Sequence, residues 1–273
     1  MIQDIGLSKL HNEYKICEMR DDDTAFYFDA AGRLMTWEEN GTLTFLSKKE
    51  IGGQPVIYLF AIDEKRYFLV TEEPADPRDG YTCRSIREVR DFGVTGKDIF
   101  AVFTAYHLWR WYADNRYCGR CAEALVPSTQ ERALCCPKCK NTVYPRINPA
   151  VIVGVTNGDK LLLTKYRTGY GHNALVAGFT EIGETLEETV AREVMEETGV
   201  KVKNIRYYKY QPWGMAQDIL VGYYCDADGD STIHMDEGEL KYAEWVPREE
   251  IELQPNNLSL TNEMMRMFKE NRI

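Results

Sequence analysis

The chain has 273 residues and a formal net charge of −10 at pH 7. At roughly 150 residues per domain, this length predicts about two domains, or one large domain with an insertion. Apolar residues make up 44% of the chain, which excludes a disordered or fibrous protein, and no apolar run approaches the roughly 18 residues of a membrane span. The negative charge argues against a protein that grips naked nucleic acid through its overall field. The first residues lack a secretory signal, so we expect a cytoplasmic protein that is not bound to membranes.

Residues 1–112 are expected to form a β-rich N-terminal domain with a scaffold or dimerisation role. Short apolar stretches broken by turn residues run from 24 to 70, and Glu38–Gly41 is the clearest hairpin signal. Pro74–Pro77 predicts a loop. Helices are expected over Ser85–Phe92 and Ile99–Asp114, the second because its apolar residues recur at helical spacing.

Residues 113–147 carry two CxxC pairs. Cys118 and Cys121 form the first pair, and Cys136 and Cys139 form the second, 14 residues further on. Two such turns supply four thiolates, which is the tetrahedral sulfur site that zinc prefers. The sequence therefore predicts a four-cysteine zinc ribbon with one Zn²⁺ per chain. Because the site is closed, its role is structural; Cys135 is an alternative to Cys136 as a ligand.

Residues 148–273 mix strands and helices without a regular βαβ rhythm, which predicts an α+β domain with a sheet packed between helices. A glycine-rich loop is expected over 168–183. Strands are expected at 149–155, 160–165, 207–210, 219–225 and 244–246, with helices at 185–198 and 262–269.

The helix over 185–198 has complete end signals. Thr185 with Glu188 three residues later is a capping box, and Gly199 is placed as the glycine that ends the helix. Val190 and Val194 belong to an apolar stripe along one face.

Three glutamates share another face of this helix. Glu193, Glu196 and Glu197 stand at positions i, i+3 and i+4, within reach of a common ion. Three like charges destabilise a helix by a few tenths of a kcal/mol per pair, so the arrangement favours a compensating cation. Hard oxygen ligands suit Mg²⁺ or Mn²⁺. The alternative is a solvated acidic face without a metal.

The wider string resembles the signature of the Nudix hydrolases, G-x5-E-x7-R-E-U-x-E-E-x-G-U, where U is apolar. Its fixed positions are Gly178, Glu184, Arg192, Glu193, Val194, Glu196, Glu197, Gly199 and Val200. The resemblance implies an α/β/α sandwich and an enzyme that cuts a pyrophosphate linked to another group with the help of divalent ions.

By the same resemblance, Glu193, Glu196 and Glu197 are metal ligands, with Glu197 or a later glutamate as the base. Glu239 falls where the family places a metal-binding or catalytic glutamate outside the signature, with Glu237 as a rival. Arg192 and Glu184 are expected to pair and to orient the loop onto the helix.

A zinc ribbon before such a domain resembles the NADH pyrophosphatase subfamily. This resemblance implies a homodimer that splits NADH into NMNH and AMP and, in bacteria, can remove NAD caps from RNA. Of the subfamily motif S-Q-P-W-P-F-P-x-S, residues 210–218 keep Gln211, Pro212 and Trp213. Tyr144, Phe179 and Trp213, with Gln211, are expected to bind the substrate.

We therefore expect a metal-dependent pyrophosphohydrolase acting on NADH or NAD⁺. One alternative is another substrate, such as ADP-ribose, FAD or NAD-capped RNA, because the motif has changed. An alternative of a different class is a non-catalytic nucleotide-sensing or RNA-binding protein. The homodimer rests on the resemblance and on the aromatic helix segment 106–112 as a candidate interface.

Overall fold

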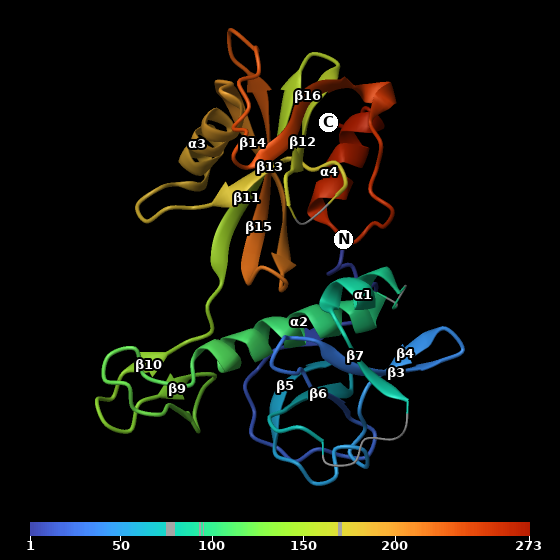
Figure 1. The fold of residues 1–273 in the computed structure, drawn as a ribbon, viewed down its shortest axis with the longest axis vertical. Helices are drawn as coiled ribbons and strands as arrows, with labels where there is room; N and C mark the ends of the chain where they lie inside the picture. Colours follow the sequence, from blue (N-terminus) through green and yellow to red (C-terminus); the bar gives the residue numbers. More distant parts are fainter. Residues whose placement is uncertain (75–79, 93, 95, 169–170) are drawn as a thin grey trace. The chain divides into compact units, whose positions relative to one another are not determined.

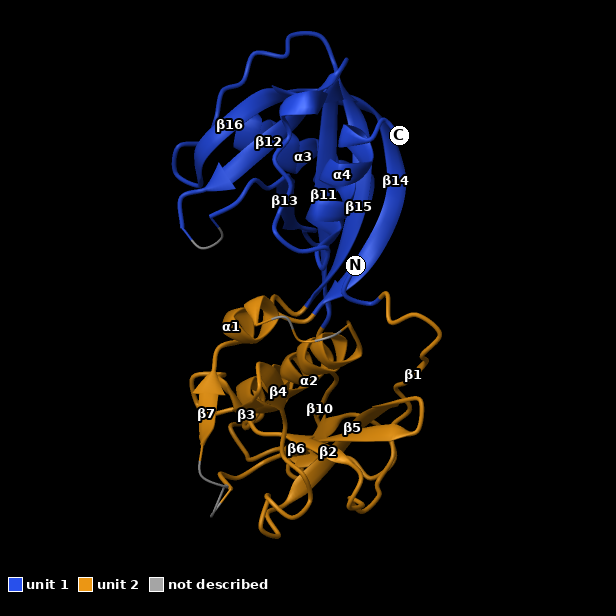
Figure 2. Cartoon of the chain, turned by 90° about the vertical axis from the view of Figure 1, so that its right-hand side faces the viewer, with its two compact units in different colours: residues 1–3, 147–213, 218–273 blue, residues 4–146, 214–217 orange. Residues whose placement is uncertain are grey.

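The computed structural model describes residues 1–74, 80–92, 94, 96–168 and 171–273. The chain divides into two compact units, coloured separately in Figure 2: unit 1 comprises residues 1–3, 147–213 and 218–273, and unit 2 comprises residues 4–146 and 214–217. The zinc region thus groups with the N-terminal region, and a three-part division at 112 and 147 stays a prediction. In the described part of the chain, no helix has the length and apolar character to cross a membrane.

Unit 1 is built on one mixed sheet with the strand order β14-β15-β11-β12-β16, and β13 pairs with β11. The strands are β11 (Asn148–Asn157), β12 (Lys160–Tyr166), β13 (Val176–Phe179), β14 (Val202–Trp213), β15 (Asp218–Ala227) and β16 (Leu240–Pro247). The helices are α3 (Leu186–Thr198), the short 3-10 helix η1 (Arg248–Glu250) and α4 (Leu260–Lys269). Strands β11 and β15 run parallel, whereas their other neighbours run antiparallel.

Two helices cover opposite faces of this sheet, as Figure 1 shows for α3 and α4. Alternate residues of the central strands point to opposite faces. Val151 and Val153 pack with Val190 and Val194 of α3 in one core. Ile152 packs with Met264, Met265 and Phe268 of α4 in the other. The expected α/β/α sandwich is confirmed.

Most expected elements of unit 1 are present, but one expectation was wrong. The segment 168–183, read as a loop, contains the strand β13, and Gly178 within it pairs with Val151. The glycines of this segment indicated a loop, so the sequence did not predict the strand. Strand β14 is also longer than the expected 207–210, because irregular register at 203–206 and 207–209 lets it continue along β15.

The described residues of unit 2 form three small sheets and two helices. Its sheets have the orders β1-β5-β6-β2, β4-β3-β7 and β10-β9-β8. The strands are β1 (Leu10–His11), β2 (Thr24–Phe26), β3 (Leu34–Glu39), β4 (Thr42–Thr44), β5 (Val56–Ile62), β6 (Lys65–Val70), β7 (Tyr81–Arg84), β8 (Val126–Pro127), β9 (Leu134–Cys135) and β10 (Thr142–Val143). The helices are α1 (Ile86–Asp91) and α2 (Gly96–Asp114).

The local signals in unit 2 are largely confirmed. Asn40 and Gly41 both have positive φ, at 51° and 76°, as a tight hairpin turn between β3 and β4 requires. Ser85 caps α1 through a capping box with Glu88. Helix α2 begins three residues before the expected Ile99. Apart from Pro74, the loop expected at Pro74–Pro77 lies outside the described residues.

Candidate active site and zinc ribbon

Helix α3 is fixed at both ends, and this fixes the direction of its glutamates. The Thr185 side chain accepts a hydrogen bond from the backbone N–H of Glu188, and the Glu188 carboxylate accepts one from the backbone N–H of Thr185. Gly199 ends the helix with a left-handed φ of 70°, a conformation that favours glycine. Because Val190 and Val194 are fully buried against the sheet, the orientation of the helix about its axis is set, and Glu193 lies against Gly178 of β13.

Gly178 explains how a carboxylate comes so close to the sheet. A Cβ atom on Gly178 would lie 1.9 Å from Cδ of Glu193, which no side chain permits. Only glycine therefore allows the Glu193 carboxylate to lie against the backbone of β13. The first glycine of the signature serves this close approach.

Arg192 organises the loop before α3, as expected. Its Nε donates to Oε1 of Glu184 at 2.6 Å and its Nη2 to Oε2 at 2.9 Å. Nη1 donates to Glu193 at 2.8 Å and to Glu196 at 2.9 Å, and Nη2 also donates to the carbonyl of Phe179 at 3.0 Å. These bonds lower the pKa of Glu184 to about 2. The guanidinium of Arg192 thus links the loop before α3 to the helix, which is a structural role.

Glu197 is the most unusual carboxylate of the site. It is 3% exposed, and its Oε2 has no hydrogen-bond partner among the described residues. Burial raises the pKa of Glu197 to about 8, and the negative charges of Glu193, Glu239 and Asp236 contribute. Burial also raises the pKa of Glu193, against the hydrogen bond from Arg192. The backbone N–H of Ala177 donates to this carboxylate and partly offsets the rise in its pKa. The buried Oε2 without a hydrogen-bond partner is still unfavourable, so this oxygen fits a cation that would complete it.

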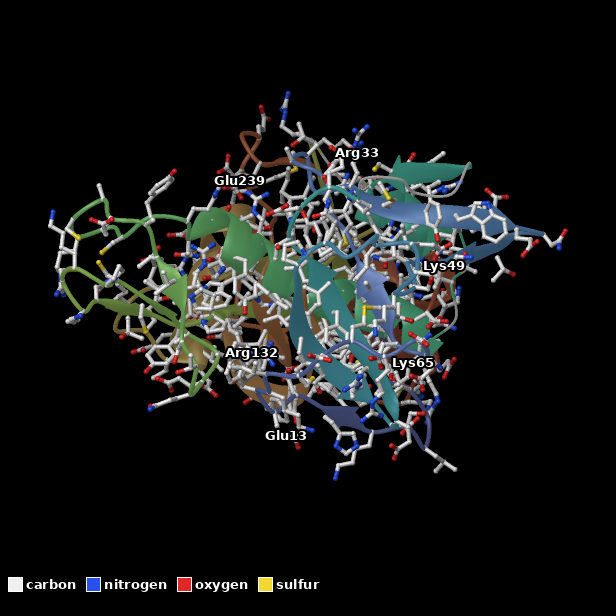
Figure 3. The ribbon with its side chains drawn as sticks, turned by 90° about the horizontal axis from the view of Figure 1, so that it is seen from below. Glu13, Arg33, Lys49, Lys65, Arg132 and Glu239 are labelled. Carbon is white, nitrogen blue, oxygen red and sulfur yellow. The ribbon has the colours of Figure 1, made fainter. Side chains whose placement is uncertain are left out.

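Glu239 as a cation ligand, with Glu237 as its rival, stays a prediction. The negative charge of Glu239 contributes to the raised pKa of both Glu193 and Glu197. Its turn is held to the end of α3, because the backbone N–H of Asp236 donates to the carbonyl of Glu197 at 2.9 Å. Figure 3 labels Glu239. Glu196 is more open, with 59% of its side chain exposed and a bond from Arg192.

The expected substrate-binding residues fall in different settings. Phe179 at the end of β13 is 52% exposed, and Trp213 ends β14, both in unit 1. Tyr144 belongs to unit 2, where it is 56% exposed and donates its hydroxyl to Glu131 at 3.0 Å. These three aromatic side chains are not core residues of their units.

Gln211, in contrast, is fully buried, and its amide is committed to the protein itself. Its Nε2 donates to the carbonyl of Leu258 at 2.8 Å and to Gln3 at 3.0 Å. Its Oε1 accepts from the backbone N–H of Leu260 at 2.8 Å. In this arrangement Gln211 supports the start of α4, and its role in substrate binding stays a prediction.

Sequence reasoning missed Asp218, which stands where the subfamily motif ends in serine. Asp218 pairs with Trp213 across the strands and is 6% exposed. Its Oδ1 has no partner among the described residues, and burial raises its pKa to about 7. The departure from the motif was the only signal that could have drawn attention to it.

The two CxxC turns form one sulfur cluster. The Sγ atoms of Cys118 and Cys139 are 3.6 Å apart, those of Cys121 and Cys136 are 3.5 Å apart, and all four lie within 4.8 Å of one another. Ala122 and Lys140, directly after each pair, share a positive φ of 59° and 62°. Four sulfurs at these spacings fit a tetrahedral zinc with bonds of roughly 2.3 Å. Cys135 lies on β9 and is not part of the cluster.

Backbone N–H groups stabilise the thiolate form of two of these cysteines, and the thiolate is the form that binds a metal ion. Arg120 donates to Sγ of Cys118 and Cys139 donates to Sγ of Cys136, both at 3.4 Å. These donors lower the pKa of Cys118 to about 6 and also lower that of Cys136. Among the described residues, only the four cysteines bring their ligand atoms this close together, so the glutamates of unit 1 are a looser group.

Two family models match this chain, one over the region of the glutamates and one over the region of the four cysteines. Residues 146–268 match the NUDIX domain family, and residues 113–144 match the NADH pyrophosphatase zinc ribbon domain. A solved NUDIX hydrolase from Nitrosomonas europaea has the same fold over 57% of this chain and 92% of its own, with 21% identity and a TM-score of 0.51. Residues 146–268 therefore carry a NUDIX domain. Residues 113–144, directly before it, carry a zinc ribbon domain of the kind described for NADH pyrophosphatases.

Curated relatives match part of this chain. The chain is 38% identical over 177 residues to the NAD-capped RNA hydrolase NudC of Enterobacter sp. (strain 638), which covers 63% of this chain and 66% of that protein. It is 39% identical over 172 residues to NudC of Shigella dysenteriae serotype 1, again covering 63% and 66%. The matched part therefore spans just under two thirds of these relatives.

Proposed function

We propose that this protein is a metal-dependent pyrophosphohydrolase that cleaves NADH or NAD⁺ into NMN(H) and AMP. The buried carboxylate of Glu197, whose Oε2 has no hydrogen-bond partner among the described residues, carries the proposal together with the neighbouring charges of Glu193 and Glu239. A buried negative charge without a counter-charge is unfavourable, whereas the same charge would be compensated in a protein that holds a cation at a phosphate.

Glu193, Glu197 and Glu239 would hold Mg²⁺ or Mn²⁺, with Glu196 at the open edge of the group. When bound, the cation offsets charge on the phosphate oxygens and lowers the pKa of a water molecule. Glu197 accepts the proton as the water oxygen bonds to one phosphorus and the bridging P–O bond breaks. The products are two monophosphates, so the reaction balances without another reactant.

The remaining residues would arrange the substrate. In unit 1, Phe179 and Trp213 offer aromatic surfaces on which a nicotinamide or adenine ring can stack. Arg192 keeps the loop on α3 and thereby fixes the glutamates. The ribbon cysteines would hold one structural zinc and take no part in the reaction, because a closed four-sulfur site has no open position.

A second candidate substrate is the NAD cap of RNA. The curated relatives bear the name NAD-capped RNA hydrolase, and the bond to be cut is the same. ADP-ribose and FAD are the other substrates to compare, because only part of the specificity motif is kept.

We also propose that the protein works as a homodimer in the cytoplasm, on the strength of the subfamily resemblance. The aromatic segment of α2 offers less support than expected, since Tyr106 and Trp109 pack their rings on Phe28 in the same unit. Light scattering of the purified protein decides the state: one 31.5 kDa chain per particle would contradict the dimer.

The function is tested by measuring hydrolysis of NADH, NAD⁺, ADP-ribose, FAD and NAD-capped RNA with Mg²⁺ or Mn²⁺. We expect NMN(H) and AMP from NADH or NAD⁺. Glu197→Gln should lower kcat by a factor of roughly 100 or more, because it removes the proton acceptor and a metal ligand. Glu187→Gln is the matched control on the same helix, since Glu187 bonds Tyr223 and lies outside the carboxylate group.

Preference for ADP-ribose or FAD would contradict NADH or NAD⁺ as the substrate, whereas the proposed metal-dependent hydrolysis of a pyrophosphate would stand. Nucleotide binding without turnover, equal in the wild type and in Glu197→Gln, would favour the non-catalytic class.

A further inference from the structure

One edge of the N-terminal sheet is incomplete. Strand β1 is two residues long and pairs only with Ile62 and Ala61 of the seven-residue strand β5. Further along β5, a register shift between Tyr58 and Phe60 leaves Leu59 without a partner in β6. Leu59 is fully buried, so its backbone carbonyl requires a hydrogen-bond donor from inside the protein.

That donor comes from the ribbon hairpin 128–133, which connects β8 with β9. Arg132 lies where this hairpin meets β5 (Figure 3), and its Nη2 donates to the carbonyl of Leu59 at 2.5 Å. The same nitrogen donates to the carbonyl of Asn12 at 3.3 Å and to its side-chain oxygen at 3.4 Å, directly after β1. The hydroxyl of Tyr14 donates to the carbonyl of Ser128 at 2.6 Å. The hairpin is thus bonded both to β5 and to residues 12–14.

Burying the guanidinium of Arg132 is unfavourable by itself. Its Nη2 bonds only to uncharged oxygens, and its Nη1 is buried without a hydrogen-bond partner among the described residues. Burial also lowers the pKa of Arg132. The guanidinium loses its hydration there, and uncharged oxygens compensate this loss only in part. The contact should therefore persist only while the rest of the hairpin holds Arg132 in place.

The four clustered cysteines give the hairpin its fixed end. Strands β8 and β9 have two residues each, and an isolated pair of strands is at best marginally stable in water. The backbone N–H of Ser128 closes the hairpin by donating to the carbonyl of Ala133 at 2.9 Å. Strand β9 then leads directly into Cys136 of the cluster. A cation bound to the sulfurs would therefore hold the hairpin that carries Arg132.

We propose that the hairpin 128–133 is a zinc-dependent latch on the N-terminal sheet. With zinc bound, Arg132 and Tyr14 hold residues 12–14 and β5 against the ribbon; without zinc, these bonds break and the edge formed by β1 and β5 opens. Because coupling between two sites is reciprocal, a mutation that opens the latch also weakens zinc binding. The inference concerns unit 2 alone and is independent of the proposed hydrolysis.

The first test is hydrogen exchange of the intact protein, measured by mass spectrometry with zinc bound and after treatment with a chelator. Without zinc, exchange at residues 9–14 and 59–62 should become about 10- to 100-fold faster, the typical worth of hydrogen bonds from a charged donor. The separate sheet β4-β3-β7 is the internal reference and should change little. Unchanged exchange at residues 9–14 and 59–62 would overturn the inference. Equal acceleration in both sheets would also contradict it, because unit 2 would then unfold as a whole.

Arg132→Gln separates the latch from zinc itself. The variant keeps the four cysteines and should still bind zinc, but exchange at residues 9–14 should be fast even with zinc bound. Removing zinc should then have little further effect on these residues. Arg116→Gln is the matched control, because Arg116 is an exposed arginine of the same ribbon region. Equal protection of residues 9–14 in the two zinc-bound variants would contradict the latch.

Zinc affinity gives a second readout. In competition with a chromophoric chelator, Arg132→Gln should bind zinc about 10-fold more weakly than Arg116→Gln. Should Arg132→Gln fail to fold, Tyr14→Phe removes a single oxygen from the latch. This variant should exchange faster at residues 12–14 and bind zinc more weakly than wild type, by a smaller factor. Exchange and zinc affinity of Tyr14→Phe that both match wild type would overturn the inference.

Discussion

At the scale of single residues, two buried carboxylates differ in what surrounds them. Glu197 lies among other acidic groups that could share a cation, which gives its burial a functional reason. Asp218 is raised in pKa by burial alone, apart from its own backbone N–H, which lowers it. Its charged form is therefore unfavourable in the folded protein, and no acidic neighbour contributes to that shift.

We predict that Asp218→Asn stabilises the protein at high pH. The folded pKa of Asp218, about 7, lies above its ordinary value of 3.8, so its contribution to stability is present below about pH 4 and is lost as the pH rises through 7. The variant should be more stable than wild type by about 1 to 3 kcal/mol at pH 8, and by less at pH 5. Urea unfolding at the two pH values measures this.

Asp226→Asn is the control, at the other end of the same strand. Arg206 lowers the pKa of Asp226 to about 2, so its contribution is present above the ordinary pKa and is lost only in acid. This variant should therefore be destabilised at pH 8. A gain from Asp218→Asn of equal size at pH 5 and pH 8 would refute the assignment.

At the scale of elements, α3 determines the site because it combines a capped start, a glycine end and a buried stripe. The sequence predicted these features correctly, since all of them depend on neighbours within four residues. The strand β13 was not predicted, because its pairing with β11 outweighs the low strand preference of Gly178. The contact between this glycine and Glu193 exists only in the folded sheet.

Loss of the α3 cap should destabilise the protein and loosen the first turn of this helix. Thr185→Ala removes the hydroxyl that accepts the N–H of Glu188 and is expected to cost about 1 kcal/mol of unfolding free energy. Hydrogen exchange should increase at the first turn of α3. Ser85→Ala is the matched control, because it removes the same kind of cap from α1 in unit 2. Equal exchange in α3 for both variants would contradict the prediction.

At the scale of the whole molecule, unit 1 and the zinc ribbon region of unit 2 depend on different interactions. Unit 1 has two apolar cores around one sheet. The ribbon region of unit 2 has three strands of two residues each. Such short strands bury little apolar surface, so we expect bound zinc to supply most of the ribbon's folding free energy.

Removal of zinc should unfold the ribbon and leave unit 1 intact. After treatment with a chelator, or in Cys136→Ser, we expect NMR signals of residues 113–146 to lose their dispersion while Mn²⁺ binding by unit 1 persists. Cys135→Ser is the control, since Cys135 is outside the sulfur cluster. Zinc loss from Cys135→Ser as complete as from Cys136→Ser would contradict the ligand assignment.

The sequence alone determined the features that arise from close spacing: the two CxxC turns, the ends of α3 and the shared face of its glutamates. Tertiary structure decided the rest. Glu197 becomes buried at the end of α3, where the turn before β16 is bonded to the helix through the N–H of Asp236 and the carbonyl of Glu197. Gln211 is buried and bonded to the backbone N–H of Leu260 at the start of α4, a contact between residues that are far apart in the sequence. Spacing along a helix follows from its period, whereas the register of distant strands depends on how the whole sheet packs.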